Sequence, residues 1–133
     1  MNIIICGAGR VGYTIAKLLS EQDHSITVID QSSEDIQKID DSLDVKAIVG
    51  KATYPSILEK ADATEADMII AVTRNDEINM LICQIAFSIF KIPLLLSPSQ
   101  APFVLAQRTL AFLHGMHDFH STYCKLLLMQ WHT

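Results

Sequence analysis

Three glycines near the beginning of the chain have the spacing of a phosphate-binding turn. They belong to the GxGxxG sequence Gly7-Ala8-Gly9-Arg10-Val11-Gly12. The motif follows an apolar, β-branched run and precedes an apolar helical pattern, which is the context in which it is informative. Its first glycine permits a tight turn, its second lets backbone N–H groups reach a pyrophosphate, and its third lets helix and strand pack closely. Because the positive end of the helix also faces this turn, the motif predicts a bound dinucleotide.

An acidic residue ends the next expected strand. Asp30 follows residues 25–29 and lies eighteen positions past Gly12, close to the spacing of the acid that binds an adenosine ribose. A carboxylate also repels a 2′-phosphate by several kcal/mol at about 4 Å and intermediate dielectric, and Gln31 and Ser32 bring no compensating arginine. We therefore expect NAD rather than NADP. The alternatives are a glycine turn that only joins strand to helix, and an acid that only caps the following helix.

Further binding candidates follow two more expected strands, at residues 45–49 and 68–72. Small residues after the first leave room for adenosine on the rim where parallel strands end. In the loop after the second strand, the hydroxyl or backbone of a threonine could bind the ribose or the phosphates, and the positive charge of an arginine could bind a phosphate. The alternative is an ordinary surface loop that only caps the following helix. These candidates are Gly50, Ala52, Thr53, Thr73 and Arg74.

Two groups of residues have types that catalysis or metal binding would use, but we expect neither role. Asp76 and Glu77 are adjacent acids in a helix's first turn, where carboxylates usually serve as caps and dipole partners. A histidine cluster has HxxHxxH spacing, but steps of three residues turn successive helical side chains by about −60°, which converges poorly on zinc. This cluster consists of His114, His117 and His120, with Cys124 four residues on.

Composition limits the class of protein. A length of 133 residues with 50% hydrophobic content is enough for one domain with a sizeable core. The net charge of −5 is spread without a basic cluster, which argues against nucleic acid and against direct insertion into, or binding to, a membrane. The three cysteines are widely spaced, and the sequence starts without a basic leader. The apolar stretch at residues 78–96 is interrupted by polar residues, which is not typical of a transmembrane span. These features favour a cytosolic protein with reduced thiols.

The elements that position these residues alternate between strand and helix. Apolar runs predict strands at 2–6, 25–29, 45–49 and 68–72, and helical periodicity predicts helices at 11–20, 33–41, 54–60 and 77–90. This pattern predicts an α/β fold, a Rossmann-like doubly wound parallel sheet whose ligand crevice lies beyond the strands' carboxyl ends. The helix at 77–90 has more bulky apolar residues than one sheet face requires. Self-association would bury them, and packing by residues 94–133 is the alternative.

The end of the chain has a different character. Residues 93–102 contain three prolines, so at most a short edge strand is expected at 94–96. We therefore divide the chain into a Rossmann-like domain at 1–93 and an atypical tail at 94–133, which is helical or poorly ordered.

Residues 1–92 resemble the TrkA N-terminal domain family, also called RCK or KTN domains, of bacterial Trk potassium uptake systems. The resemblance rests on GAGRVG at 7–12, Asp30, GKAT at 50–53, ADMIIAVT at 66–73 and DEINM at 76–80. It implies NAD or NADH as ligand, with ATP or ADP in some relatives. It also implies a cytoplasmic, non-enzymatic regulatory subunit that forms a dimer or tetramer. The subunit would lie at the inner face of the plasma membrane, attached to a membrane-embedded Trk-type potassium transporter that it gates by a nucleotide-dependent change of shape.

Two other functions remain open. An NAD-dependent oxidoreductase fragment is one, although residues 94–133 leave little chain for a substrate pocket and a positioned acid or base. A truncated remnant that only folds and binds nucleotide is the other.

Overall fold

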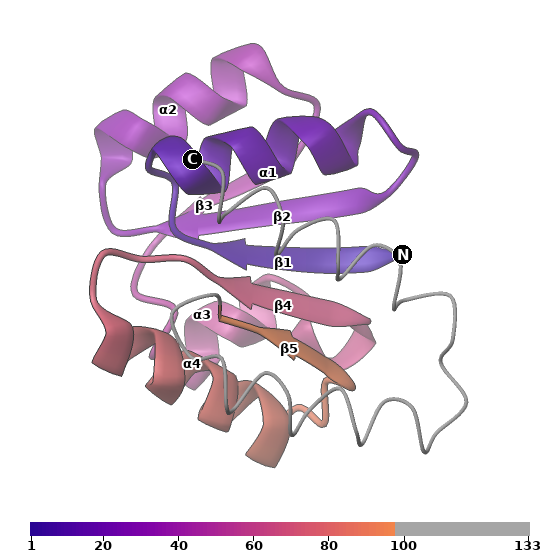
Figure 1. Cartoon of the computed structure of the whole chain (residues 1–133), viewed down its shortest axis with the longest axis vertical. Helices are drawn as coiled ribbons and strands as arrows, with labels where there is room; N and C mark the ends of the chain where they lie inside the picture. Colours follow the sequence, from indigo (N-terminus) through magenta and orange to yellow (C-terminus); the bar gives the residue numbers. More distant parts are fainter. Residues whose placement is uncertain (98–133) are drawn as a thin grey trace.

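The computed structural model describes residues 1–97, which form a five-stranded parallel sheet with the strand order β3-β2-β1-β4-β5 (Figure 1). The strands are β1 (Asn2–Cys6), β2 (Ser25–Asp30), β3 (Lys46–Val49), β4 (Met68–Ala71) and β5 (Leu94–Leu96). The helices are α1 (Arg10–Ser20), α2 (Ser33–Ser42), α3 (Pro55–Lys60), the 3-10 turn η1 (Ala63–Glu65) and α4 (Asp76–Ser88). The predicted α/β, Rossmann-like fold is confirmed.

The centre of the sheet is buried on both faces. β1 pairs with β2 and β4, and Ile3 lies opposite Ile26 on one side and Met68 on the other. Every residue of β1 after Asn2 is buried, as a continuous apolar strand of a parallel sheet must be. Since all these strands run in the same direction, the loops after β1, β2, β3 and β4 share one edge of the sheet.

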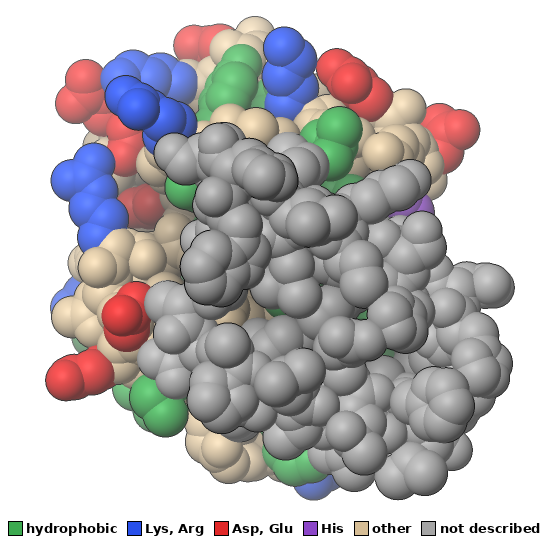
Figure 2. Space-filling view, viewed as in Figure 1, with side chains coloured by type: hydrophobic (Ala, Val, Ile, Leu, Met, Phe, Trp, Pro, Cys, Tyr) green, Lys and Arg blue, Asp and Glu red, His purple; other side chains and the backbone are tan. Residues whose placement is uncertain are grey.

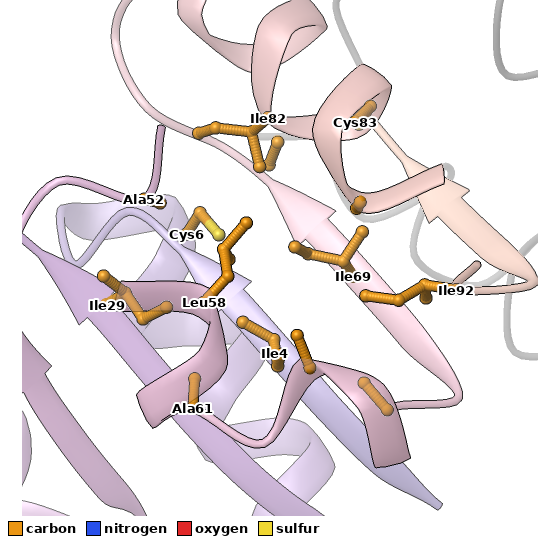
Figure 3. Packing of buried hydrophobic residues seen from close by; sticks show 14 of the residues in the cluster. Ile4, Cys6, Ile29, Ala52, Leu58, Ala61, Ile69, Ile82, Cys83 and Ile92 are labelled. Atoms are coloured by element: carbon orange, nitrogen blue, oxygen red, sulfur yellow. The ribbon is translucent and has the colours of Figure 1, made fainter. Parts of the chain in front are cut away.

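Two separate cores cover the two faces. On one face, Ile3 and Ile5 pack with apolar residues of α1 and α2. On the other, Ile4 and Cys6 point toward Leu58 of α3 and Ile82 of α4 (Figure 3). Alternate residues of each strand therefore serve opposite layers, which is the doubly wound arrangement.

The expected elements are present, with small differences at their ends. α1 begins at Arg10, one residue before the expected start, and α4 begins at Asp76 with Asn75 as its cap. α4 ends at Ser88 rather than Phe90, since Ile89 caps it and Lys91 then turns to a φ of 56°. Such a left-handed conformation cannot continue a right-handed helix.

The expected short edge strand is β5, which pairs with β4 and extends the sheet past residue 93. The histidine cluster, Cys124 and the rest of the expected tail from residue 98 onward lie outside the described residues. Within residues 1–97, no helix combines the length and the apolar character needed to cross a bilayer. On the face shown in Figure 2, acidic and basic side chains are interspersed over the described part of the chain.

Candidate functional site

The glycine turn after β1 is bound to the strands on either side of β1. The Gly7 N–H donates to the Ile29 carbonyl of β2 at 2.8 Å. Gly7 has a φ of 120°, and a Cβ there would lie 2.8 Å from the Val72 carbonyl oxygen, just past β4. The positive φ and this close approach both require glycine. Gly7 therefore joins the ends of β1, β2 and β4.

Gly12 and Gly9 differ in what surrounds them. A Cβ on Gly12 would lie 1.8 Å from the Gly7 carbonyl oxygen, so α1 packs directly on the turn only because this position has no side chain. A Cβ on Gly9 would meet no atom of residues 1–97 within 4 Å. Gly9 is the N-cap of α1 and has extended backbone, so unpaired N–H groups of the helix start beside open space. Packing accounts for Gly12 but does not account for Gly9.

Asp30 connects the glycine turn to the beginning of α2. Its Oδ2 accepts a hydrogen bond from the Ala8 N–H at 2.7 Å, and its Oδ1 accepts one from the Ser32 N–H at 2.8 Å. Ser32 itself caps α2, since its hydroxyl accepts from the Asp35 N–H. Each carboxylate oxygen has a second lone pair, so a half-buried Asp30 retains acceptor capacity for a hydroxyl group.

The other residues of the glycine motif have contrasting surroundings. Ala8 is buried and Val11 is partly buried, and both pack against the core on the α1 side of the sheet. Arg10 is exposed, as is Arg74 after β4. Among the described residues the one ion pair is Lys46 with Asp62, so neither arginine is neutralised by a carboxylate there.

The loop after β3 reaches the same edge. The Gly50 N–H donates to the Asp30 carbonyl oxygen at 2.9 Å, which places this loop beside the acid. Ala52 packs its side chain into the core on the α3 side, and Thr53 is partly exposed. The structure thus brings all the sequence-predicted candidates to the carboxyl edge of the sheet, with Thr73 and Arg74 in the loop after β4.

Thr73 is held by a residue that the sequence analysis cited only within the DEINM segment and did not select as a site candidate. Asn79 of α4 accepts hydrogen bonds at Oδ1 from the Thr73 N–H at 3.0 Å and from the Thr73 hydroxyl at 2.6 Å. Its Nδ2 donates to the Thr73 carbonyl oxygen at 3.1 Å. The signal for Asn79 was a polar residue on the helix face that otherwise buries Ile82, Cys83 and Ala86. Asp76 and Glu77 are exposed in the first turn of α4.

Two buried thiols lie beneath this edge. Burial, together with nearby Cys83 and Asp30, raises the pKa of the Cys6 thiol, and burial raises the pKa of Cys83 to about 12. Both therefore stay neutral at physiological pH and are poor nucleophiles.

Known proteins resemble this chain in sequence and in fold. The chain is 43% identical over 93 residues to the Trk system potassium uptake protein TrkA of Azorhizobium caulinodans, which covers 70% of this chain. The chain spans only 20% of the length of that relative.

Two solved structures share the fold at 18% identity. The Kef CTD of Shewanella denitrificans in AMP-bound form has a TM-score of 0.62, covering 95% of this chain and 98% of its own. The GsuK channel bound to NAD has a TM-score of 0.65, covering 80% of this chain and 20% of its own. The family model of the TrkA-N domain matches residues 3–97, and the chain therefore belongs to the TrkA-N domain family.

Proposed function

We propose that this chain is a regulatory nucleotide-binding domain of a Trk-type potassium uptake transporter. The observation that carries the proposal is the hydrogen bond of the Ala8 N–H to Asp30, because it joins the glycine turn, where we place the phosphates, to the acid that we expect to bind the ribose. Membership of the TrkA-N domain family supports it, as does the potassium uptake relative. The AMP and NAD in the structures of fold neighbours agree with an adenine nucleotide as ligand.

The residues fit a dinucleotide such as NAD or NADH. The open space at Gly9, beside the N-terminus of α1, suits a pyrophosphate. Asp30 would accept hydrogen bonds from the adenosine ribose, and a 2′-phosphate there would meet its charge. Arg10 and Arg74 are free of carboxylate partners among the described residues and would add positive charge toward the phosphates. ATP and ADP carry the same ribose and diphosphate, so they are competing ligands.

Regulation then requires only that two ligands favour different states of the protein. A ligand shifts a conformational equilibrium by its difference in affinity for the two states, and the shift is reciprocal between coupled sites. We infer that exchange of NAD for NADH changes the shape of the domain and gates a membrane-embedded transporter subunit. The domain would then lie in the cytoplasm, at the inner face of the plasma membrane.

Self-association is part of the same proposal. Met80, Leu81 and Phe87 of α4, here called the α4 face, are 47%, 49% and 41% exposed. Three large apolar side chains on one helix are the kind of surface that a protein interface buries. We infer that the α4 face packs against a second copy of the chain in a dimer, or in a tetramer built from dimers.

Binding and turnover experiments on the full chain test this proposal. Isothermal titration with NAD, NADH, ATP and ADP measures which nucleotide binds, and absorbance of the nicotinamide ring measures any hydride transfer. Binding without turnover is the expected result. Turnover would favour the oxidoreductase fragment, whereas no binding at millimolar nucleotide would leave only a folded remnant.

A further inference from the structure

Asn79 is a buried polar side chain on an apolar helix face. It is 2% exposed, and the residues on the same face of α4 are Ile82, Cys83 and Ala86. Burying an amide is unfavourable unless its hydrogen bonds are made, and an aliphatic residue would continue the pattern of this face. The position of Asn79 is therefore explained by its partners rather than by packing.

Within residues 1–97, the hydrogen bonds of the Asn79 side chain all go to Thr73. The amide oxygen accepts from the Thr73 N–H and hydroxyl, and the amide nitrogen donates to the Thr73 carbonyl. A backbone N–H can only donate and a carbonyl can only accept, so this arrangement fixes the orientation of the amide. One side chain thus holds both backbone polar groups and the hydroxyl of a single loop residue.

The loop held by Asn79 is in direct contact with the glycine turn. A Cβ on Gly7 would lie 2.8 Å from the Val72 carbonyl oxygen and 3.1 Å from the Thr73 nitrogen. On its other side, Gly7 donates to Ile29, and the next residue, Ala8, donates to Asp30. A displacement of Thr73 would therefore move or release one wall of the turn where the phosphates are expected.

We propose that Asn79 is a positioning residue for the nucleotide site, an inference that rests on the proposed function. It acts through Thr73 and Val72, which set the place of the glycine turn, and it does not touch the nucleotide. Because the turn would bind the diphosphate common to NAD and ADP, loss of the Asn79 side chain lowers the affinity for both ligands by a similar factor. A residue that only stabilised the fold would lower the melting temperature and leave the affinity of the folded protein unchanged.

The experiment compares Asn79→Ala with the control Ile82→Val. Ile82 lies on the same buried face of α4, but its side chain has no group that could form a hydrogen bond to Val72 or Thr73. Both variants of the full chain are titrated with NAD and with ADP at a temperature where thermal melts show them folded. We expect Asn79→Ala to raise both dissociation constants at least tenfold, and Ile82→Val to change them less than twofold. Equal affinities in Asn79→Ala and the wild type would overturn the proposal.

Amide hydrogen exchange without nucleotide separates this inference from the proposed function. We expect Asn79→Ala to speed exchange in residues 72–75 and 6–9, with little change in residues 25–28, and Ile82→Val to leave both segments protected. Unchanged exchange in both segments would contradict the positioning role. Failure of the wild type to bind any of the four nucleotides would instead remove the proposed function. If Asn79→Ala does not fold, Asn79→Asp keeps the acceptor, removes the donor to Thr73, and is measured in the same way.

Discussion

The backbone N–H of Ala8 and the carboxylate of Asp30 are 2.7 Å apart and form a hydrogen bond between segments that are 22 residues apart in the chain. Asp30 also accepts from Ser32, so one side chain ties the glycine turn to the loop that begins α2. Hydrogen bonds to a charged acceptor contribute about 1.5–3 kcal/mol, and an amide left without its partner costs a similar amount. The two halves of the proposed site are therefore fixed relative to each other before any ligand arrives.

Replacement of Asp30 should weaken the binding of NAD and also reduce the selectivity for NAD over NADP. We expect Asp30→Ala to raise the dissociation constant for NAD by about tenfold to a hundredfold, the equivalent of losing one charged hydrogen bond. The affinity for NADP should fall less than the affinity for NAD, because the repulsion between Asp30 and the 2′-phosphate of NADP disappears. Titration with both nucleotides measures this. Asp40→Ala, at an exposed position of α2, is the control for loss of one negative charge, and unchanged NAD affinity in Asp30→Ala would refute the placement of the ribose.

The glycines of the motif should separate binding from stability. Gly9→Val adds a side chain where no atom of the described part of the chain lies within 4 Å, so it should cost only about 1 kcal/mol of capping yet abolish nucleotide binding by occupying the place of the phosphates. Gly12→Ala forces a Cβ to 1.8 Å from the Gly7 carbonyl oxygen and should cost about 3 kcal/mol or more of stability.

Chemical denaturation and isothermal titration of the two variants distinguish these effects. The pattern expected is a folded Gly9→Val protein that does not bind, and a Gly12→Ala protein that unfolds early. A Gly9→Val protein with wild-type affinity would show that the open space at the start of α1 is not used by phosphate.

The local pattern of the sequence was sufficient for most of this site and insufficient for one part of it. The positions of Gly7, Gly12 and Asp30 could be predicted because they depend on spacing within one strand, turn and helix and the strand that follows. Asn79 was cited from the sequence only within the DEINM segment at 76–80, and its role could not be predicted, because its partner Thr73 is defined by how α4 packs on the sheet and a polar residue in a helix is ordinarily interpreted as exposed. The end of α4 at Ser88 was also not predicted. A glycine usually marks the left-handed residue that follows a helix, but here that residue is Lys91.

The buried cysteines should be almost inert in the native protein. At pH 8, a shift of the Cys83 pKa from 9.0 to about 12 lowers its thiolate fraction by about a thousandfold. Cys6 is also fully buried with a raised pKa. We expect a Cys124→Ser variant to react with an aromatic disulfide reagent only on addition of denaturant. Rapid labelling of two thiols in the native state would contradict the packing of β1 against α4.

The same thiols predict lower stability in alkali. In the unfolded chain they ionise near their ordinary pKa of 9.0, whereas in the folded protein burial keeps them neutral. The unfolded state then binds fewer protons, so the free energy of unfolding is unaffected below pH 8 and declines as the pH rises above 9.0, by up to about 1.4 kcal/mol per pH unit for each thiol. Urea denaturation at pH 7.5 and pH 10 measures this, and Cys83→Ala should show a smaller decline than the wild type. Parallel declines in the two proteins would rule out Cys83 as a cause.

The α4 face supplies the remaining prediction, which concerns assembly. Leu81 and Phe87 are both about half exposed and lie about 120° apart around the axis of α4, so a two-fold contact between α4 helices that covers this whole arc would bury them on both copies. Leu81→Glu and Phe87→Glu each place a charge in that contact and should convert the oligomer to a monomer in sedimentation velocity. Gln37→Glu adds the same charge at an exposed position of α2 and should leave the oligomer intact. A wild-type monomer at high concentration, or oligomers that survive both α4 substitutions, would mean that this face is buried by something other than a second copy.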